Sequence, residues 1–176
     1  MRLLYHIFED EYNEKREIVK HKILNACGLN KTIKLNARKC QIKEISFEEA
    51  KQFLDKFHIQ GNAFSPIRLG GWYNDILVGV MTFYDGGFSS KIKNEYELTR
   101  FATDYNYHVR GLASKILKHF IREYNPKKIK SFADIRWTPD GENNLYTKLG
   151  FKLTKQISPS YHYYNHEFGT KRFNRI

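Results

Sequence analysis

Glu97-Leu98-Thr99-Arg100-Phe101-Ala102-Thr103 and, shortly after it, Arg110-Gly111-Leu112-Ala113-Ser114 decide the fold of this chain. The first stretch predicts a β-strand, and the second is a small-residue turn that opens an amphipathic helix. That helix has apolar residues at the three-to-four spacing of one buried face, at Leu112, Ile116, Leu117, Phe120, Ile121 and Tyr124. A strand over Ile129 to Trp137 and a short helix ending at Gly150 are expected next.

A strand, a turn, a helix and a second strand in this order form a unit with backbone N–H groups at a helix N-terminus, where phosphate binds readily. A β-α-β crossover with a glycine at its turn accounts for the same pattern without any ligand. We therefore expect an α/β (α+β) fold, with a phosphate-binding turn as one of two interpretations.

Size and composition are those of one globular domain with some excess. The chain has 176 residues, of which 41% are hydrophobic and 15% aromatic. No apolar run approaches the roughly 20 residues that cross a bilayer, so we expect a cytoplasmic protein with no membrane partner. Cys27 and Cys40 have no close metal-ligand partners, and neither a disulfide framework nor a metal site is expected. The oligomeric state is left open.

The charge indicates a polyanionic partner. Thirty Lys and Arg residues against nineteen Asp and Glu residues give a formal net charge of +11. Such an excess favours nucleic acid, and the interspersed Tyr and Phe residues could stack on bases. A basic surface that only keeps the protein soluble, or a cationic coenzyme pocket, would account for the same excess of positive charge. DNA is the partner that we expect.

The remaining elements follow from local signals. Gln41 to Ile45 alternates as a strand does, and Ser46 with Glu49 forms a capping box for a helix whose apolar face is Phe47, Ala50, Phe53, Leu54 and Phe57. Two strands, Ile67 to Tyr73 and Ile76 to Tyr84, flank an Asn74-Asp75 hairpin turn, and the second is apolar enough to be central. Two further strands are expected around Lys152 to Ile157 and Tyr161 to Tyr164, before a basic tail from Gly169 to Arg175.

The first 36 residues read as a helical N-terminal extension to a domain that spans residues 37–176. A helix is expected over residues 9–26, with a thin apolar stripe and a stop at Gly28. Its acidic start, Glu9 to Glu11, is explained by the helix dipole.

Two short motifs resemble the GNAT N-acetyltransferase superfamily. His108-Val-Arg-Gly-Leu-Ala113 is similar to the family's pyrophosphate loop, Q/R-x-x-G-x-G/A, although His108 replaces the usual Gln or Arg. Tyr146-Thr-Lys-Leu-Gly-Phe151 resembles its Y-x-x-x-G-F ending, whose tyrosine faces the coenzyme A sulfur. The resemblance implies a twisted mixed sheet flanked by helices, and acetyl-CoA or another acyl-CoA as the donor.

Acyl transfer needs a cradle for the donor's pyrophosphate, a donor to the thioester oxygen, an acid and a base. The candidate cofactor-binding residues are Phe101 and Ala102, on the strand that would hold the thioester, and Arg110, Gly111, Leu112, Ala113, Ser114 and Lys115, which would hold the pyrophosphate. His58 ends a helix as a cap, or lines the acceptor pocket. Tyr146 is the candidate acid or a core aromatic, and Asp134 is the candidate base.

Arg100 and Asp134 each place a charge within an apolar stretch, and adjacent strands could pair them as a buried ion pair or as catalytic groups. Leu98-Thr-Arg-Phe101, Ser114, Ser131-Phe-Ala-Asp134 and Tyr146 resemble in order the Mom group of GNAT-like proteins, which modify adenine in phage DNA. The resemblance implies catalytic roles for Arg100, Ser114, Asp134 and Tyr146.

The segment from Phe8 to Cys40 is similar to the junction in phage proteins where a Vsr-like or homing-endonuclease-like nuclease precedes a GNAT-like domain. We expect a phage-type acyltransferase that modifies a DNA nucleobase. Two alternatives stay open: a DNA-binding or host-inhibitory module without turnover, and a protein or small-amine N-acetyltransferase.

Overall fold

The computed structural model describes residues 5–85, 94–138, 144–158, 162–164 and 172–173. Its centre is a five-stranded sheet in the order β2-β3-β4-β5-β7. Neighbouring strands are antiparallel except β5 and β7, which are parallel. The strands are β2 (Gln41–Glu44), β3 (Ile67–Tyr73), β4 (Ile76–Asp85), β5 (Glu95–Thr103) and β7 (Lys128–Ser131).

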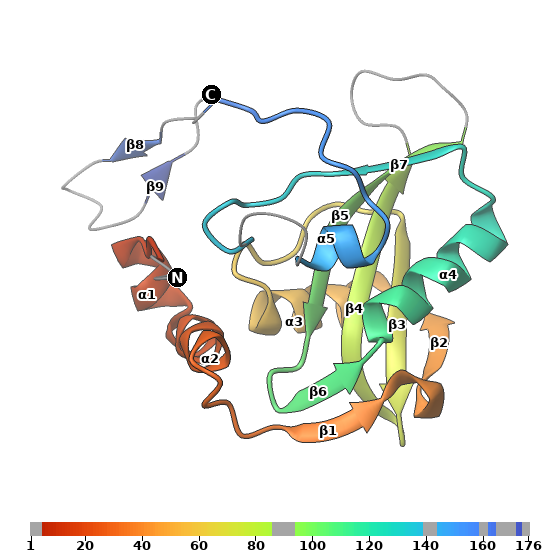
Figure 1. The fold of residues 1–176 in the computed structure, drawn as a ribbon, viewed down its shortest axis with the longest axis horizontal. Coiled ribbons are helices and arrows are strands. Elements are labelled where there is room, and N and C mark those ends of the chain that lie inside the picture. The colour runs from red at the N-terminus through yellow and green to blue at the C-terminus, as the bar shows by residue number, and fades with distance from the viewer. Residues whose placement is uncertain (1–4, 86–93, 139–143, 159–161, 165–171, 174–176) are drawn as a thin grey trace.

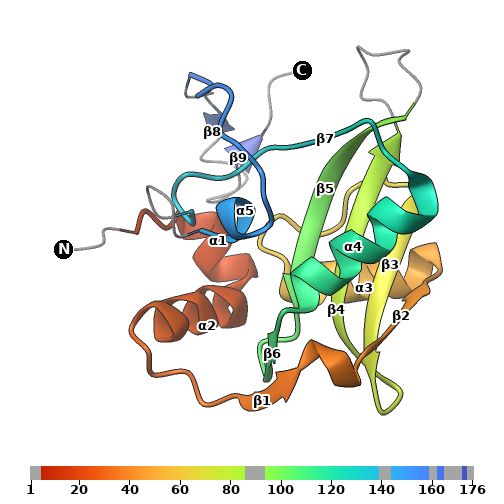
Figure 2. The same cartoon turned by 45° about the vertical axis from the view of Figure 1, so that its right-hand side comes forward.

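Two helices cover opposite faces of this sheet (Figures 1 and 2). α4 (Leu112–Tyr124) packs on one face, where Ile116 and Phe120 are completely buried and the Phe120 ring stacks on Phe83 at 3.6 Å. α3 (Phe47–Phe57) packs on the other face through Ala50, Phe53 and Leu54. The expected α/β fold is confirmed: a twisted, mostly antiparallel sheet lies between helices.

Local signals placed several elements correctly. Ser46 and Glu49 form the expected capping box at the start of α3. Asn74 and Asp75 adopt positive φ angles of 46° and 63°, as a tight hairpin between β3 and β4 requires. β4 is the middle strand of the sheet, as its apolar sequence predicted.

The N-terminal segment forms two helices where one was expected. α1 (Glu9–Glu14) ends and α2 (Arg16–Ala26) begins at Lys15, whose backbone leaves the helical region at φ −128° and ψ 34°. The Lys15 ammonium donates a hydrogen bond to the Asp55 carbonyl oxygen at the end of α3, at 2.7 Å. A tertiary contact therefore coincides with the break, at a position where the sequence has neither glycine nor proline.

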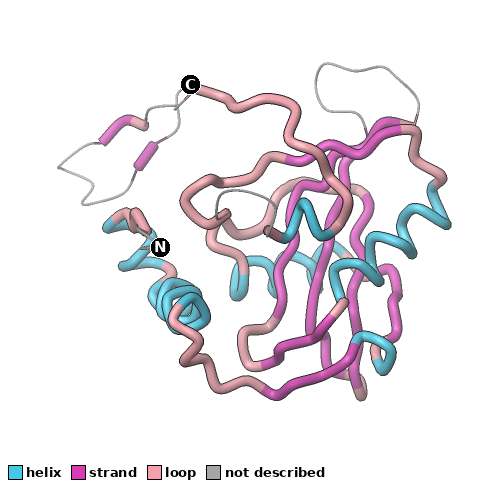
Figure 3. The backbone as a smooth tube through the Cα atoms, in the orientation of Figure 1, coloured by secondary structure: helices cyan, strands magenta, loops and turns pink. Residues whose placement is uncertain are grey.

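A two-stranded parallel sheet was not expected. β1 (Ile33–Asn36) pairs with β6 (Tyr107–Arg110), and the short helix η1 (Ala37–Lys39) follows β1 (Figure 3). The residues of β6 had been assigned to the turn before α4. The division of the chain at residue 37 stays a prediction, although β1 begins before that boundary and contacts the domain.

The chain after α4 is less regular than expected. β7 ends at Ser131 and not at Trp137: its pairing with β5 stops there, and apolar residues beyond it are exposed, Phe132 at 62% and Ile135 at 69%. Residues 152–157 form no strand, and Leu153 is 89% exposed. The short helix α5 (Leu145–Lys148) ends before Gly150 as expected.

Of the expected strand near Tyr164, the structure contains β8 (Tyr163–Tyr164), which pairs with β9 (Arg172–Phe173). The rest of the basic tail, and the loop that contains Lys91 and Lys93, lie outside the described residues. None of the described helices is both long enough and apolar enough to cross a membrane.

Candidate active site

The site begins where β5 and β7 separate. β7 pairs with β5 only as far as Leu98, and β5 continues to Thr103 without it. The Ser131 hydroxyl donates to the Leu98 carbonyl oxygen at 2.9 Å and so occupies the last acceptor of the paired region. Beyond this point, one edge of β5 is open, since no described strand pairs with it there.

A β-bulge sets the direction of that open edge. Arg100 pairs with Thr82 and Leu98 with Phe83, so Thr99 is the extra residue. Its hydroxyl lies 2.6 Å from the Ser65 hydroxyl and 2.8 Å from that of Thr82, both of which are buried. This three-hydroxyl cluster holds the bulge in place, and no sequence motif indicated it.

The bulge and the strand register decide which backbone groups face the open edge. The Asp104 N–H donates to the Val78 carbonyl oxygen at 3.1 Å. Because successive N–H groups of a strand point to opposite sides, the Ala102 N–H also faces β4, and the N–H groups of Phe101 and Thr103 face the open edge. Phe101 therefore offers the backbone donor that was expected on this strand for a thioester.

Arg100 does not pair with Asp134, so the expected ion pair is wrong. The Arg100 guanidinium donates to the carbonyl oxygens of Gly61, at 3.1 Å, and Thr99, at 2.8 Å. Burial lowers the pKa of Arg100, while the charges of Glu97 and Tyr146 act in the opposite direction. Arg100 thus joins the loop after α3 to β5.

Asp134 lies in the loop beyond β7 and pairs with Arg136 two residues later, at 2.6 Å. Arg136 also binds Glu11 of α1 through two hydrogen bonds, of 2.9 and 3.0 Å. Burial would raise the pKa of Asp134, but the hydrogen bonds from Arg136 outweigh burial and lower it. Asp134 does not reach Arg100 because the chain beyond β7 turns away from the sheet before Asp134. Its role as a base stays a prediction.

The start of α4 presents the expected phosphate-binding geometry. Gly111 is its N-cap at φ 83°, a left-handed conformation that favours glycine. The first intrahelical bond runs from the Lys115 N–H to the Gly111 carbonyl oxygen, which leaves the preceding N–H groups of Leu112, Ala113 and Ser114 without helical partners. Such N–H groups bind anions. Ser114 is half-buried in this first turn.

Lys115 has a different contact from the one expected. Its ammonium donates to the carbonyl oxygens of Ala37, at 2.9 Å, and Cys40, at 2.6 Å. These contacts fix η1 against α4. Other cations lie closer to the helix start: Arg110, which the sequence analysis selected, and Lys34 and Lys39, which it did not select.

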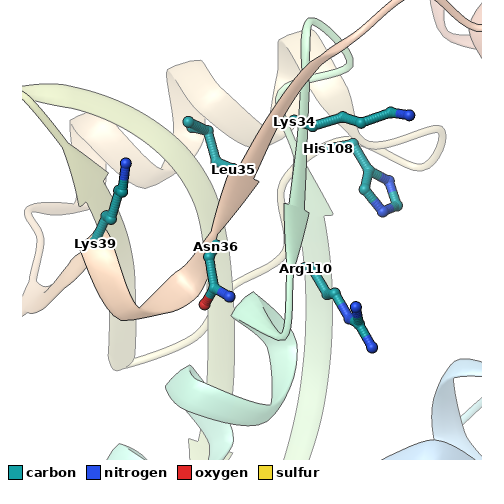
Figure 4. Close-up of a pocket in the computed structure, with 6 residues that line it drawn as sticks. All are labelled: Lys34, Leu35, Asn36, Lys39, His108 and Arg110. Carbon is teal, nitrogen blue, oxygen red and sulfur yellow. The ribbon is translucent and has the colours of Figure 1, made fainter.

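Those residues surround a cavity of about 500 Å³ along β1 and β6, shown in Figure 4. The side chains of Lys34, His108 and Arg110 extend to the same side of the two strands. The cavity is lined by Lys34, Leu35, Asn36, Lys39, His108 and Arg110. β1 places Lys34 directly beside His108 in the register of the two strands. The pairing of β1 with β6 therefore brings a cation to His108, the position where the loop motif usually has Gln or Arg.

Tyr146 lies near both Arg100 and the open edge. Its hydroxyl is 3.4 Å from the Phe132 carbonyl oxygen, a long contact, and its ring packs edge-to-face on Phe151 at 5.9 Å. Tyr146 also acts electrostatically on Arg100, as the smallest of the influences on the pKa of that arginine. This position suits an acid beside the end of a donor that follows the open edge of β5.

A second cavity, of about 290 Å³, lies between the N-terminal helix α2, the end of α3 and β5. Its lining is Ile18, His21, Lys22, Asn25, Asn30, Thr32, Phe57, His58, Ile59, Phe101, Ala102, Thr103, Tyr105, Tyr107 and His108. None of these residues carries a carboxylate. Sequence reasoning selected His58, Phe101 and Ala102 of this set, and it missed the residues from α2 because they match no motif.

His58 occupies both of its expected positions, as the C-cap of α3 and in the wall of this cavity. Its Nδ1 accepts a hydrogen bond from the Gln60 N–H at 3.2 Å. Burial, with the nearby cations Arg100, Lys22 and Lys15, lowers the pKa of His58 to about 3. The imidazole is therefore neutral at physiological pH.

The two cavities and the open edge together fit an acyl-CoA. N–H groups at the start of α4 and the cations of the larger cavity would hold its phosphates. The open edge of β5 would hold the amide-containing arm, and Tyr146 would face its sulfur. Bound there, the donor would supply an activated acyl carbon next to the smaller cavity.

Comparisons with known proteins agree with this geometry at the level of the fold. An aminoglycoside acetyltransferase from an uncultured soil metagenomic sample, in complex with sisomicin, superposes with a TM-score of 0.52 at 14% identity, covering 73% of this chain and 98% of that one. A transcriptional regulator from Bacillus halodurans C-125 superposes with a TM-score of 0.52 at 13% identity, covering 69% and 99%. No curated protein matches the chain.

A sequence model of the acetyltransferase (GNAT) family matches residues 33–151, from the start of β1 to the end of the Tyr146–Phe151 motif. The match spans more than half of the chain and contains the open edge of β5, the start of α4 and Tyr146. The chain therefore belongs to the acetyltransferase (GNAT) family of enzymes, whose acyl donor is acetyl-CoA.

Proposed function

We propose that this enzyme transfers an acyl group from acetyl-CoA, or a related acyl-CoA, to an amino group of a DNA nucleobase. The observation that carries the proposal is the lining of the smaller cavity. It combines aromatic rings, neutral polar groups and Lys22, and no carboxylate is among the described residues that line it. This is the chemistry of a site for a planar, neutral or anionic acceptor.

Aromatic residues give the cavity its stacking surfaces. Phe57, Phe101, Tyr105 and Tyr107 line it. Bases stack on such rings with about 1–3 kcal/mol per base, and the amide groups of Asn25 and Asn30 can bond the edge of a base. A volume of about 290 Å³ lies at the lower end of ligand pockets and suits one flat ring system.

The charges near the cavity disfavour a polycationic acceptor. Burial is the main cause of the lowered pKa of His58, and the nearby cations Arg100, Lys22 and Lys15 lower it further. An aminoglycoside would bring several ammonium groups into this field with no lining carboxylate to pair with them. A nucleotide brings phosphate, which the same cations attract, as does the net charge of +11.

The test is nucleoside mass spectrometry of DNA from cells that express the protein. We expect an acylated base, which disappears in Tyr146→Phe because this variant lacks the hydroxyl beside the donor's sulfur. Tyr84→Phe, which removes a hydroxyl outside both cavities, should still modify DNA. Unmodified DNA from cells with folded wild-type protein would contradict the proposal. Acetylation of a peptide or an aminoglycoside instead would identify a different acceptor.

A further inference from the structure

The N-terminal helix α2 is part of the wall of the acceptor-side cavity. Ile18, His21, Lys22 and Asn25 of this helix face the same space as Phe101 and Ala102 of β5. The family match begins at residue 33, so these side chains lie outside the matched region. The cavity is incomplete without them.

The imidazole of His21 is held in one orientation within this wall. Its ring stacks on Tyr105 at a centroid distance of 3.9 Å and an interplanar angle of 9°. Its Nδ1 lies 3.2 Å from the Asn30 side-chain oxygen. An amide oxygen only accepts, so Nδ1 carries the hydrogen and Nε2 keeps a lone pair.

His58, in the same cavity, has the opposite arrangement. A backbone N–H only donates, so the bond from Gln60 assigns the lone pair of His58 to Nδ1 and the hydrogen to Nε2. Its depressed pKa makes it a poor proton acceptor. His58 can thus donate a hydrogen bond to an acceptor molecule, whereas His21 can take a proton from one.

The surroundings of His21 contain few competing charges. On α2 itself, Glu17 lies one turn earlier and interacts electrostatically with His21, and Lys22 follows it. From the elements packed against α2, the titratable groups in the cavity are His58, Tyr105, Tyr107 and His108.

We propose that His21 is the base that takes the proton from the acceptor amine, so the N-terminal extension contributes a catalytic residue. The proposal rests on the proposed function for the position of the acceptor in this cavity. The acceptor nitrogen forms a bond to the acyl carbon, and the carbon–sulfur bond breaks. The sulfur leaves as a thiol with the proton of the Tyr146 hydroxyl, and the proton from nitrogen passes to His21 Nε2. Solvent then returns a proton from His21 to Tyr146.

The experiment replaces the base and keeps the ring stack. His21→Phe preserves a flat ring on Tyr105, and kcat should fall by about 10²–10⁴, the usual contribution of a positioned base. His119→Phe on α4 makes the same exchange outside the cavity and should leave kcat unchanged.

Two further measurements separate catalysis from folding. Calorimetry should show acetyl-CoA binding to His21→Phe within about twofold of wild type. His21→Ala leaves room for an imidazole, so added imidazole should restore part of its rate. Full activity in His21→Phe, or no effect of added imidazole on His21→Ala, would overturn the proposal.

Wild-type protein is first tested with an oligonucleotide, a peptide and an aminoglycoside. The amine that it acylates is then used as the acceptor in all of these assays. If only the peptide or the aminoglycoside reacts, the proposed function fails, and the His21 variants then test the base with that amine. If none of the three reacts, both proposals fail.

Discussion

Replacing Arg136 with methionine should release the N-terminal helices from the domain without unfolding the sheet. Arg136 is 20% exposed and bonds Asp134 and Glu11, which are 25% and 10% exposed. Methionine keeps the length of the side chain but leaves the two carboxylates facing each other. The Arg136 guanidinium also lies 4.6 Å from the centre of the Phe8 ring, and the substitution removes this contact.

The size of the effect follows from this burial. Removing one member of a buried ion pair costs about 3–5 kcal/mol, and the partial exposure of this cluster puts the cost near the lower value. About 3 kcal/mol corresponds to a change of roughly a hundredfold in an equilibrium constant. Because Arg136 joins α1 to the loop beyond β7 and lies outside the sheet, we expect this cost to appear as local opening of the two helices.

Hydrogen exchange measures that opening directly. Amides of α2 should lose roughly a hundredfold of protection in Arg136→Met, while amides of β4 should keep theirs. Glu11→Gln removes one charge from the same cluster, and the double variant should lose less than the sum of the two single changes. Equal loss of protection in α2 and β4, or no loss in α2, would refute the reasoning.

Three other outcomes follow from single contacts. A Cβ at Gly79 would lie 2.5 Å from Leu112 Cδ2, so Gly79→Ala should lower the stability by about 1–3 kcal/mol in a denaturant titration, and Leu112→Ala in the same chain should recover part of it. The pKa of His58 is lowered to about 3 in the folded state, so as the pH falls the unfolded chain binds the proton first. The free energy of unfolding should therefore decrease by up to about 1.4 kcal/mol per pH unit from about pH 6.5 downward. His58→Asn should flatten this slope in thermal melts. Arg110→Glu should weaken acetyl-CoA binding about tenfold or more by calorimetry, and an equal affinity for this variant and for Lys51→Glu, outside both cavities, would contradict the donor site.

The elements that the sequence predicted correctly are those specified by local signals. The capping box at Ser46, the Asn74-Asp75 turn and the apolar periodicity of α4 each depend on residues a few positions apart. Gly111 was identified as part of a small-residue turn and of the loop motif, and its left-handed N-cap conformation was seen only in the structure.

The elements that were missed depend on distant partners. The pairing of β1 with β6 joins segments far apart in sequence, and each segment is only four residues long, so its short alternation of apolar and polar residues does not specify a partner. The Arg100–Asp134 pair was wrong because Arg136, two residues further on, competes for the same carboxylate. Residues 152–157 contain strand-forming residues but pair with no strand in the part of the chain that the structure describes, and they are irregular.

The contacts of the N-terminal segment also determine when it can fold. Glu11 and Arg136 are 125 positions apart, and Lys115 reaches Ala37 across 78 positions. Contacts of such long range form late, because closing the intervening chain costs entropy before any contact is gained. During synthesis, α1 and α2 leave the ribosome long before Arg136 does, so they wait with Ile18 and Val19 uncovered while the sheet assembles. A chaperone that binds exposed apolar helices would therefore be able to bind α1 and α2 during that interval.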